Sequence, residues 1–250
     1  MKLLLWVSLG ALACAAFASS APARADSTGA MVIGEFSHAA LGALPEKWKL
    51  LTFPKVRNHT SYVLAADGDA IAVRAEARAS ASALVTDVRI DPHEYPIIRW
   101  RWKIANLIDR ADLTRKNGDD YPARLYINFR DENAKLGFFE RIEAAFYRNR
   151  YGQDPPTATI NYVWDGKAAA GTVAPNAYTD RVRMFVVRSG AQAVGRWVEE
   201  ERNLLEDYRA AFGKEPPAIV SVAIMTDTDN TGESVVAWYG DIAMRKQTEK

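Results

Sequence analysis

The sequence predicts an all-β protein, an antiparallel β-sandwich that carries two short helices as decorations. Many segments alternate apolar and polar residues with period two, as half-buried strands do. Turn dipeptides such as Asp67-Gly68, Asp165-Gly166 and Ser189-Gly190 lie between these segments. The strands and helices do not alternate in the regular way that predicts a parallel α/β sheet, so two packed antiparallel sheets are expected.

The strands follow from the period-two pattern, taken in chain order. The predicted strands are Met31 to Phe36, Trp48 to Phe53, Ser61 to Ala66, Ala70 to Ala75, Ala83 to Ile90, Ile97 to Ile104, Ala123 to Phe129, Thr157 to Trp164, Arg181 to Arg188, Ile219 to Thr226 and Val235 to Met244.

Two segments have helical spacing instead. In Lys135 to Asn149 the apolar residues recur every three or four positions. Leu204 to Phe212 has Asn203 as an N-cap with Glu206 three residues later, which is a capping-box arrangement, and Gly213 as its C-terminal cap. Both helices are predicted at the sheet edges.

The first residues predict export from the cytoplasm. Lys2 precedes an apolar run from Leu3 to Phe17, and the triplet Ala23-Arg24-Ala25 has the small-x-small pattern of a cleavage site. The run is shorter than the roughly 20 residues that span a bilayer, so a cleaved signal peptide over residues 1–25 is expected. Cys14 offers a lipoprotein alternative, but Ala11 stands where a lipobox normally has Leu.

The rest of the chain, residues 26–250, is predicted to be one periplasmic or secreted domain, because no repeat or low-complexity linker divides it. Cleavage removes Lys2, Arg24 and the one cysteine, so 30 of the 32 basic residues remain against 31 acidic ones, a net charge of −1. Disulfides are thereby excluded. Non-specific binding to nucleic acid, which needs a surplus of cations, is also not expected.

The segment Ile97 to Ile104 (IIRWRWKI) has tryptophans on one side of a strand and cations on the other. Period-two spacing turns Trp100 and Trp102 inward and Arg99 and Arg101 outward. Trp238 is also predicted to lie in the core. The cations need a separate explanation, either as a solvated face paired with the acidic run Glu199 to Glu201 or as part of a binding site.

The next predicted strand, Ala123 to Phe129, turns its own polar residues outward in the same way. If the two strands are neighbours, one sheet face can hold a polar ligand through bidentate arginine contacts and a tyrosine platform. Trp164 offers a stacking surface there, although a buried tryptophan is the commoner case. The predicted ligand-binding residues are Arg99, Arg101, Asp120, Arg124, Tyr126, Asn128, Asn161 and Trp164.

An acidic loop, Thr226 to Gly232, is a candidate metal site. It places hard oxygen ligands at alternating positions, as Ca²⁺ requires, although it lacks the spacing of an EF-hand. The predicted ligands are Asp227 and Asp229, with Asp241 completing the set. A plain turn stabilised by Asp and Asn side chains is the alternative.

Paired carboxylates raise a second functional class, a glycoside hydrolase or lyase that uses two acids as general acid and base. The candidate carboxylates are Asp119, Asp120, Glu199, Glu201 and Asp229. Serine-hydrolase elbows, zinc-protease motifs, P-loops and dinucleotide-binding fingerprints are absent from the sequence.

Several motifs in order resemble one bacterial family. The motifs IRWRWKI, GDDYPARLYINF, NYVWDGK, GRWVEEERNLLEDYRAAFG and AIMTDTDNTGESVVAWYGDI are similar to those of an exported domain family of unknown function, numbered three thousand and forty-seven. The resemblance covers residues 31–244 and implies no transferable activity. More loosely, GEFSHAALGALPEKW and WYGDI look like the first and last strands of jelly-roll carbohydrate-binding modules, which implies that these strands pair and that a structural Ca²⁺ and a glycan ligand belong to the fold.

The expected function is therefore non-enzymatic binding of a polar or anionic carbohydrate-like molecule in the cell envelope. The glycoside hydrolase or lyase and a non-catalytic envelope scaffold that binds another protein are the alternatives. A scaffold would expose an apolar patch with a polar rim.

Overall fold

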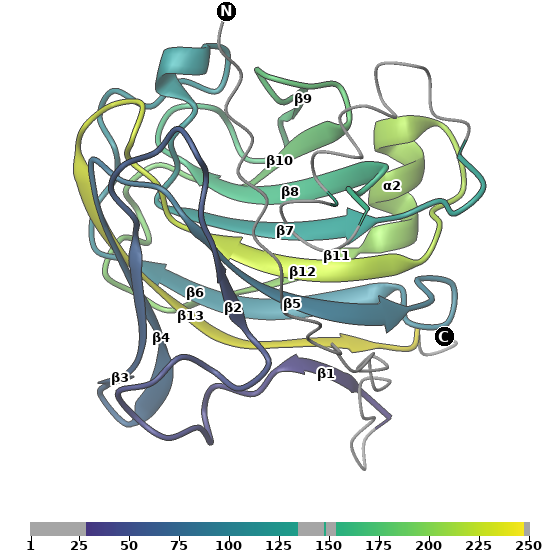
Figure 1. Ribbon diagram of the computed structural model, residues 1–250, viewed down its shortest axis with the longest axis horizontal. Coiled ribbons are helices and arrows are strands. Elements are labelled where there is room, and N and C mark those ends of the chain that lie inside the picture. The colour runs from purple at the N-terminus through teal and green to yellow at the C-terminus, as the bar shows by residue number, and fades with distance from the viewer. Residues whose placement is uncertain (1–28, 135–147, 149–153, 248–250) are drawn as a thin grey trace, which may run out of the picture.

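The computed structural model describes residues 29–134, 148 and 154–247, and they form two β-sheets packed face to face (Figure 1). Sheet A has the strand order β11 (Val198–Asn203), β6 (Ile97–Ile104), β13 (Ser234–Arg245), β4 (Ala70–Arg78) and β3 (Ser61–Asp67), and β1 (Met31–Gly34) also pairs with β13. Sheet B has the order β2 (Lys49–Leu51), β5 (Ala83–Ile90), β12 (Ile219–Met225), β7 (Ala123–Phe129), β8 (Ala158–Asp165), β10 (Val182–Ser189) and β9 (Val173–Pro175).

The predicted β-sandwich is confirmed, with one difference in strand direction. β8 and β10 run parallel, whereas the other paired strands of the described chain are antiparallel, so sheet B is mixed. The first and last strands pair as expected, with Met31 opposite Met244. The sequence did not predict β9 and β11, because neither has an apolar pattern of period two. β9 has three residues, and β11 carries charges on both of its faces.

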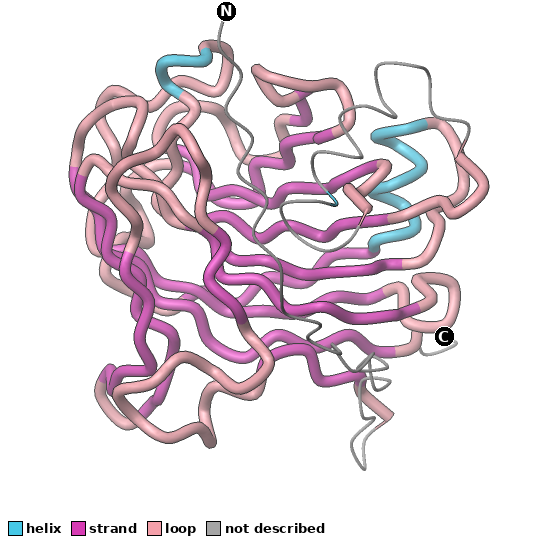
Figure 2. The backbone as a smooth tube through the Cα atoms, viewed as in Figure 1, coloured by secondary structure: helices cyan, strands magenta, loops and turns pink. Residues whose placement is uncertain are grey.

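Helical structure lies at the margins of the sandwich (Figure 2). The predicted helix at Leu204–Phe212 is confirmed as α2, with Asn203 Oδ1 accepting from the Leu205 and Glu206 amides and Gly213 in the left-handed conformation at φ 67°. A 3₁₀ turn, η1, covers Lys116–Gly118. The helix predicted at Lys135 to Asn149 lies outside the described residues, Arg148 apart. No helix in the described part of the chain is long and apolar enough to cross a membrane.

The two sheets meet through a layer of aromatic rings. Trp100 of β6 stacks on Tyr162 of β8 with ring centroids 5.1 Å apart, and Trp102 lies 6.2 Å from Trp164. The inward orientation predicted for Trp100 and Trp102 is confirmed. Trp164 is fully buried in the same layer, and its Nε1 donates to the carbonyl of Gly190 over 3.1 Å. It therefore packs the core and offers no surface for a ligand to stack on.

β6 and β7 do not lie side by side, so the prediction of one continuous polar face is wrong. The chain crosses from sheet A to sheet B between them, and the outward residues of the two strands face opposite sides of the sandwich. Arg99 and Arg101 are thus on a different surface from Arg124. Period-two alternation shows which side of a strand is apolar. It does not show to which of the two sheets the strand belongs.

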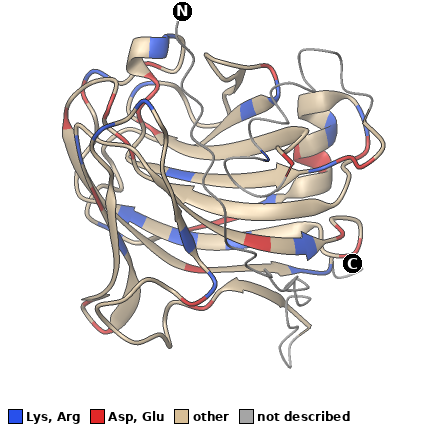
Figure 3. Cartoon of the chain, in the orientation of Figure 1, with Lys and Arg blue, Asp and Glu red and all other residues tan. Residues whose placement is uncertain are grey.

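The outer face of sheet A explains the cations of β6. Arg99 pairs with Glu199 at 3.4 Å and with Glu201 at 3.2 Å, which confirms the interpretation of a paired, solvated face. Arg101 lies over the ring of Trp197 at 4.9 Å. Basic and acidic residues are mixed over the molecule rather than gathered by sign in the view of Figure 3.

The prediction that Trp238 lies in the core is wrong, because Trp238 lies on this outer face. Its ring is half-buried beneath Lys103, whose Nζ is 4.3 Å from the ring centroid, and Lys103 also pairs with Asp67. Gly240 leaves room for the cation over Trp197, since a Cβ there would come within 2.4 Å of Arg101 Cγ. Cation–π contacts therefore cover indole rings that would otherwise be exposed.

The buried position of Trp164 predicts a large loss of stability on truncation. The Trp164→Ala variant is expected to lower the free energy of unfolding by about 3–5 kcal/mol, because it leaves a cavity between the sheets. Urea denaturation measures this, with Leu41→Ala as the control, since Leu41 is 57% exposed. Equal and small effects in both variants would contradict the burial of Trp164.

Candidate functional site

A groove of about 470 Å³ crosses the outer face of sheet B. It runs over β2, β5, β12, β7 and β8, and a residue at the start of β10 also lines it. The strands are in register, so their outward residues form rows perpendicular to the strand direction. Two neighbouring rows differ in polarity, and this contrast is the main chemical feature of the groove.

The first row is polar. Asp87 of β5 is opposite Ser221 of β12, Ser221 is opposite Asn128 of β7, and Asn128 is opposite Thr159 of β8. Asn128 Nδ2 donates to Ser221 Oγ over 3.0 Å, and Thr159 Oγ1 donates to Asn128 Oδ1 over 2.8 Å. These bonds orient the amide, and the Ser221 hydroxyl hydrogen and the second amide hydrogen of Asn128 can still donate to a ligand.

The residues of the second row that line the groove are apolar or aromatic. Val85, Ala223 and Tyr126 are in register on β5, β12 and β7. Leu51 and Phe53 pack on the same side against the buried residues Ala83, Ala223 and Met225. The central strand β12 contributes only the small side chains of Ser221 and Ala223 to these two rows. The floor of the groove is therefore low between the larger side chains of β5 and β7.

Tyr126 connects the groove to the protein interior. Its ring lines the groove, and its hydroxyl accepts a hydrogen bond of 3.1 Å from Arg124 Nη1. Burial raises the pKa of Tyr126 to about 12, against the lowering effect of the Arg124 charge. The phenol is neutral at physiological pH, and its hydroxyl donates to Met225 Sδ over 3.7 Å.

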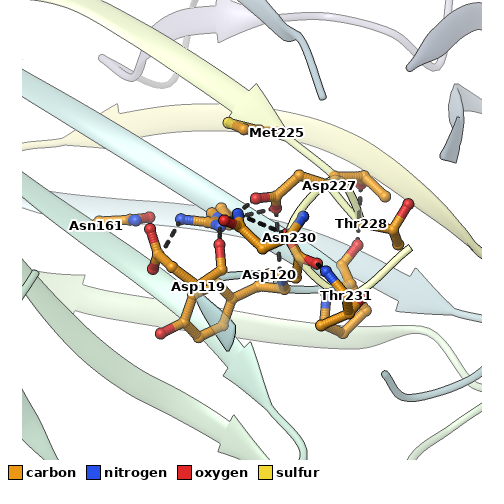
Figure 4. Close-up of polar contacts among 12 residues, drawn as sticks. Asp119, Asp120, Asn161, Met225, Asp227, Thr228, Asn230 and Thr231 are labelled. Atoms are coloured by element: carbon orange, nitrogen blue, oxygen red, sulfur yellow. Dashed lines mark hydrogen bonds and ion pairs between the residues drawn. The ribbon is translucent and has the colours of Figure 1, made fainter. Parts of the chain in front are cut away.

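Arg124 itself is buried and fully committed to structural contacts. Figure 4 shows Asp119, Asp120 and Asp227 close together at this site. Its Nε donates to Asp227 Oδ1 over 2.8 Å, and its Nη2 donates both to Asp227 Oδ2 and to the carbonyl of Asp119. Burial acts to lower the pKa of Arg124, but the Asp227 charge outweighs it and the pKa lies above the usual range. The guanidinium therefore holds two loops at the end of sheet B and is not presented to solvent.

The acidic loop is held by a second carboxylate. Asp120 Oδ2 accepts from the Thr231 amide over 2.6 Å, and Oδ1 accepts from the Asn230 amide over 3.2 Å. Oxygens of Asp120, Asp227 and Asp229 lie within 4.8 Å of one another. A Ca²⁺ ion here stays a prediction, and it would use Asp120 where the sequence indicated Asp241.

Asp241 does not belong to this cluster. Its Oδ1 accepts from the Phe36 and Ser37 amides over 2.6 and 2.9 Å, so the side chain holds the turn that follows β1. Asp241 is on β13 of sheet A, whereas Asp227 follows β12 of sheet B. The prediction that Asp241 joins Asp227 and Asp229 is therefore wrong.

The predicted ligand-binding residues thus separate into five places. Tyr126 and Asn128 line the groove. Arg124 and Asn161 are buried next to it, and Asp120 holds the loop at its end. Arg99 and Arg101 lie on sheet A and Trp164 in the core. The sequence pattern missed Ser221, although a single serine at an outward position of the apolar run IVSVAIM was a usable signal.

The carboxylate pair required by a glycosidase is not assembled among the described residues of the groove. Asp87 supplies the carboxylate there, and it pairs with Lys49 at 3.4 Å. Asp119, Asp120 and Asp227 hold loops together. Glu199 and Glu201 belong to sheet A and pair with arginine. The groove lining itself offers polar groups for hydrogen bonds and side chains for apolar contact.

A family model described as "Protein of unknown function (DUF3047)" matches residues 46–243. The chain belongs to this family. The resemblance predicted from the motifs is therefore confirmed for this DUF3047 protein. A comparison with curated proteins finds no match.

Several solved structures are similar to this chain at low identity. The family 30 carbohydrate-binding module of a Clostridium thermocellum cellulosomal cellulase is 12% identical with a TM-score of 0.35, over 87% of this chain and 94% of that one. Endoglucanase 3 of glycoside hydrolase family 12 from Trichoderma harzianum is 9% identical with a TM-score of 0.39, over 84% and 99%. The glycoside hydrolase domain of Endo-D from Streptococcus pneumoniae R6 is 9% identical with a TM-score of 0.31, over 81% of this chain but 22% of that one. These values are too low to transfer a substrate.

The buried ion pair between Arg124 and Asp227 predicts a large loss of stability when the carboxylate is removed. The Asp227→Asn variant is expected to lower the free energy of unfolding by about 3 kcal/mol or more, because buried Arg124 loses the carboxylate that accepts two of its hydrogen bonds and keeps the Asp119 carboxylate at 3.6 Å. Chemical denaturation tests this, with Asp180→Asn as a control at an ion pair whose acid is 93% exposed. A loss for Asp227→Asn no larger than that of the control would show that the pair is not structural.

Proposed function

We propose that this protein binds an elongated, carbohydrate-like molecule in the groove of sheet B. The observation that supports it is the polar row of Asp87, Ser221, Asn128 and Thr159 next to an apolar row that contains Tyr126. Sugar rings present hydroxyl edges and apolar faces, so a chain of them matches both rows at once. The floor is built on regular strands, which keeps the site preorganised.

Other ligand classes fit the groove less well. An alkyl chain would cover the Ser221 and Asn128 donors without accepting from them, at a cost of about 1–3 kcal/mol for each buried group left unpaired. A peptide that adds a strand needs a sheet edge, whereas this groove lies on the face of sheet B. A polyhydroxylated ligand avoids both difficulties.

The binding is proposed to be non-catalytic and to occur outside the cytoplasm. The single carboxylate in the described groove lining supports non-catalytic binding. The amino-terminal segment supports export, because it has the composition of a cleavable signal peptide. The ligand is then a glycan of the periplasm or of the surroundings of the cell.

Removal of the central amide is expected to weaken binding. The Asn128→Ala variant should bind neutral oligosaccharides about tenfold more weakly, because one hydrogen bond to the ligand and the orientation of Ser221 are lost. Calorimetric titration against a panel of neutral oligosaccharides measures this. Arg101→Ala is the matched control, because it removes a polar side chain of similar accessibility on sheet A.

Two results would contradict this proposal. If Arg101→Ala weakened binding and Asn128→Ala did not, the site would lie on sheet A. If no oligosaccharide bound or raised the melting temperature, where saturation at a hundredfold the dissociation constant adds about 2.7 kcal/mol, the envelope-scaffold alternative would be favoured.

A further inference from the structure

A second pocket of about 470 Å³ adjoins one end of the groove. Pro156 lines both, and so connects them. Arg130 comes two residues after Asn128 and therefore continues the line of outward side chains at the end of β7. A ligand that spans both rows of the groove and extends beyond the polar row therefore reaches Arg130.

The pocket has an excess of positive charge. Its charged lining residues are Arg130, Asp131, Glu132, Arg148, Asp154, Arg181 and Lys214. Two of the three carboxylates are already neutralised, since Asp154 pairs with Arg148 and Glu132 pairs with Arg89 at 3.1 Å. Asp131 is the remaining acid, and Oδ1 of its side chain accepts from the Asn133 amide over 2.9 Å.

Arg130 is a partly buried cation of this pocket. Its Nη2 donates to the carbonyl of Asp154, but no carboxylate of the described chain lies within ion-pair distance of its guanidinium. Its Nε is buried and has no acceptor among the residues that the structure describes. A partly desolvated guanidinium without an anionic partner in the described chain is unfavourable, and an oxyanion is a group that can offset its charge.

We infer that this pocket binds an oxyanion substituent, a carboxylate or a sulfate ester, carried by the glycan that occupies the groove. The inference rests on the proposed function of the groove and narrows the ligand to an anionic polysaccharide. The neutral part of the chain contacts the polar row, and the anion contacts Arg130 and the exposed Lys214.

The experiment compares neutral, uronate-containing and sulfated oligosaccharides of equal length by calorimetric titration. The wild-type protein is expected to bind at least one anionic series about tenfold more tightly than the neutral series, with a preference that weakens as salt is raised. Arg130→Gln should abolish this preference and leave neutral binding unchanged, and the exposed Lys214→Gln variant should reduce it without a risk to folding. Arg78→Gln, the same change on β4 of sheet A, is the control and should keep the preference.

The outcomes separate the two proposals. Equal affinity for neutral and anionic chains, or a preference that survives both Arg130→Gln and Lys214→Gln, overturns the anion pocket while the groove proposal stands. If no oligosaccharide binds, the groove proposal fails, and titration with inorganic sulfate then decides the pocket alone. Sulfate binding that is lost in Arg130→Gln and kept in Arg78→Gln supports the pocket, and no sulfate binding overturns it.

Discussion

Trp100 and Trp102 of sheet A meet Tyr162 and Trp164 of sheet B in the middle of the sandwich, and the outer surfaces depend on that contact. Each of these strands must turn its large rings inward to bury them, and alternation then turns the residues between them outward. A shift of one residue in either strand would expose the aromatic layer and bury the polar groups instead. The free-energy cost of such a shift fixes the strand register in both sheets.

The groove is a consequence of this register. Ser221 and Asn128 face outward because Val222 and Ile127 face the core, and pairing across β12 and β7 then brings the two polar side chains together. Ser221 and Asn128 are far apart in the sequence. The low floor has the same origin, since Ala223 is the next outward residue of β12 and larger side chains flank it on β5 and β7.

The buried ionic cluster has a different role from the one that its residue types suggest. Arg124, Asp227 and Asp120 are the kinds of residue that bind ligands, yet their hydrogen bonds connect the loop before β7 with the loop after β12. One contact joins this cluster to the groove, because Arg124 donates to the hydroxyl of Tyr126. The cluster thereby fixes the tyrosine ring that lines the groove, and a charged network that never touches solvent contributes to the shape of the site.

Local residue pattern by itself determined the class of the fold, most of the strands, the caps of α2 and the inward tryptophans of β6, because period, propensity and capping act over a few neighbouring residues. It also determined family membership, since the motifs occur in order along the chain. Only the tertiary structure decided which strands are neighbours, and therefore that Arg101 and Arg124 lie on opposite sides, that Trp164 is buried, and that Asp241 is away from the acidic loop. Strand pairing is a long-range choice among segments with the same alternation, and it is made by the packing of the whole aromatic layer rather than by any one segment.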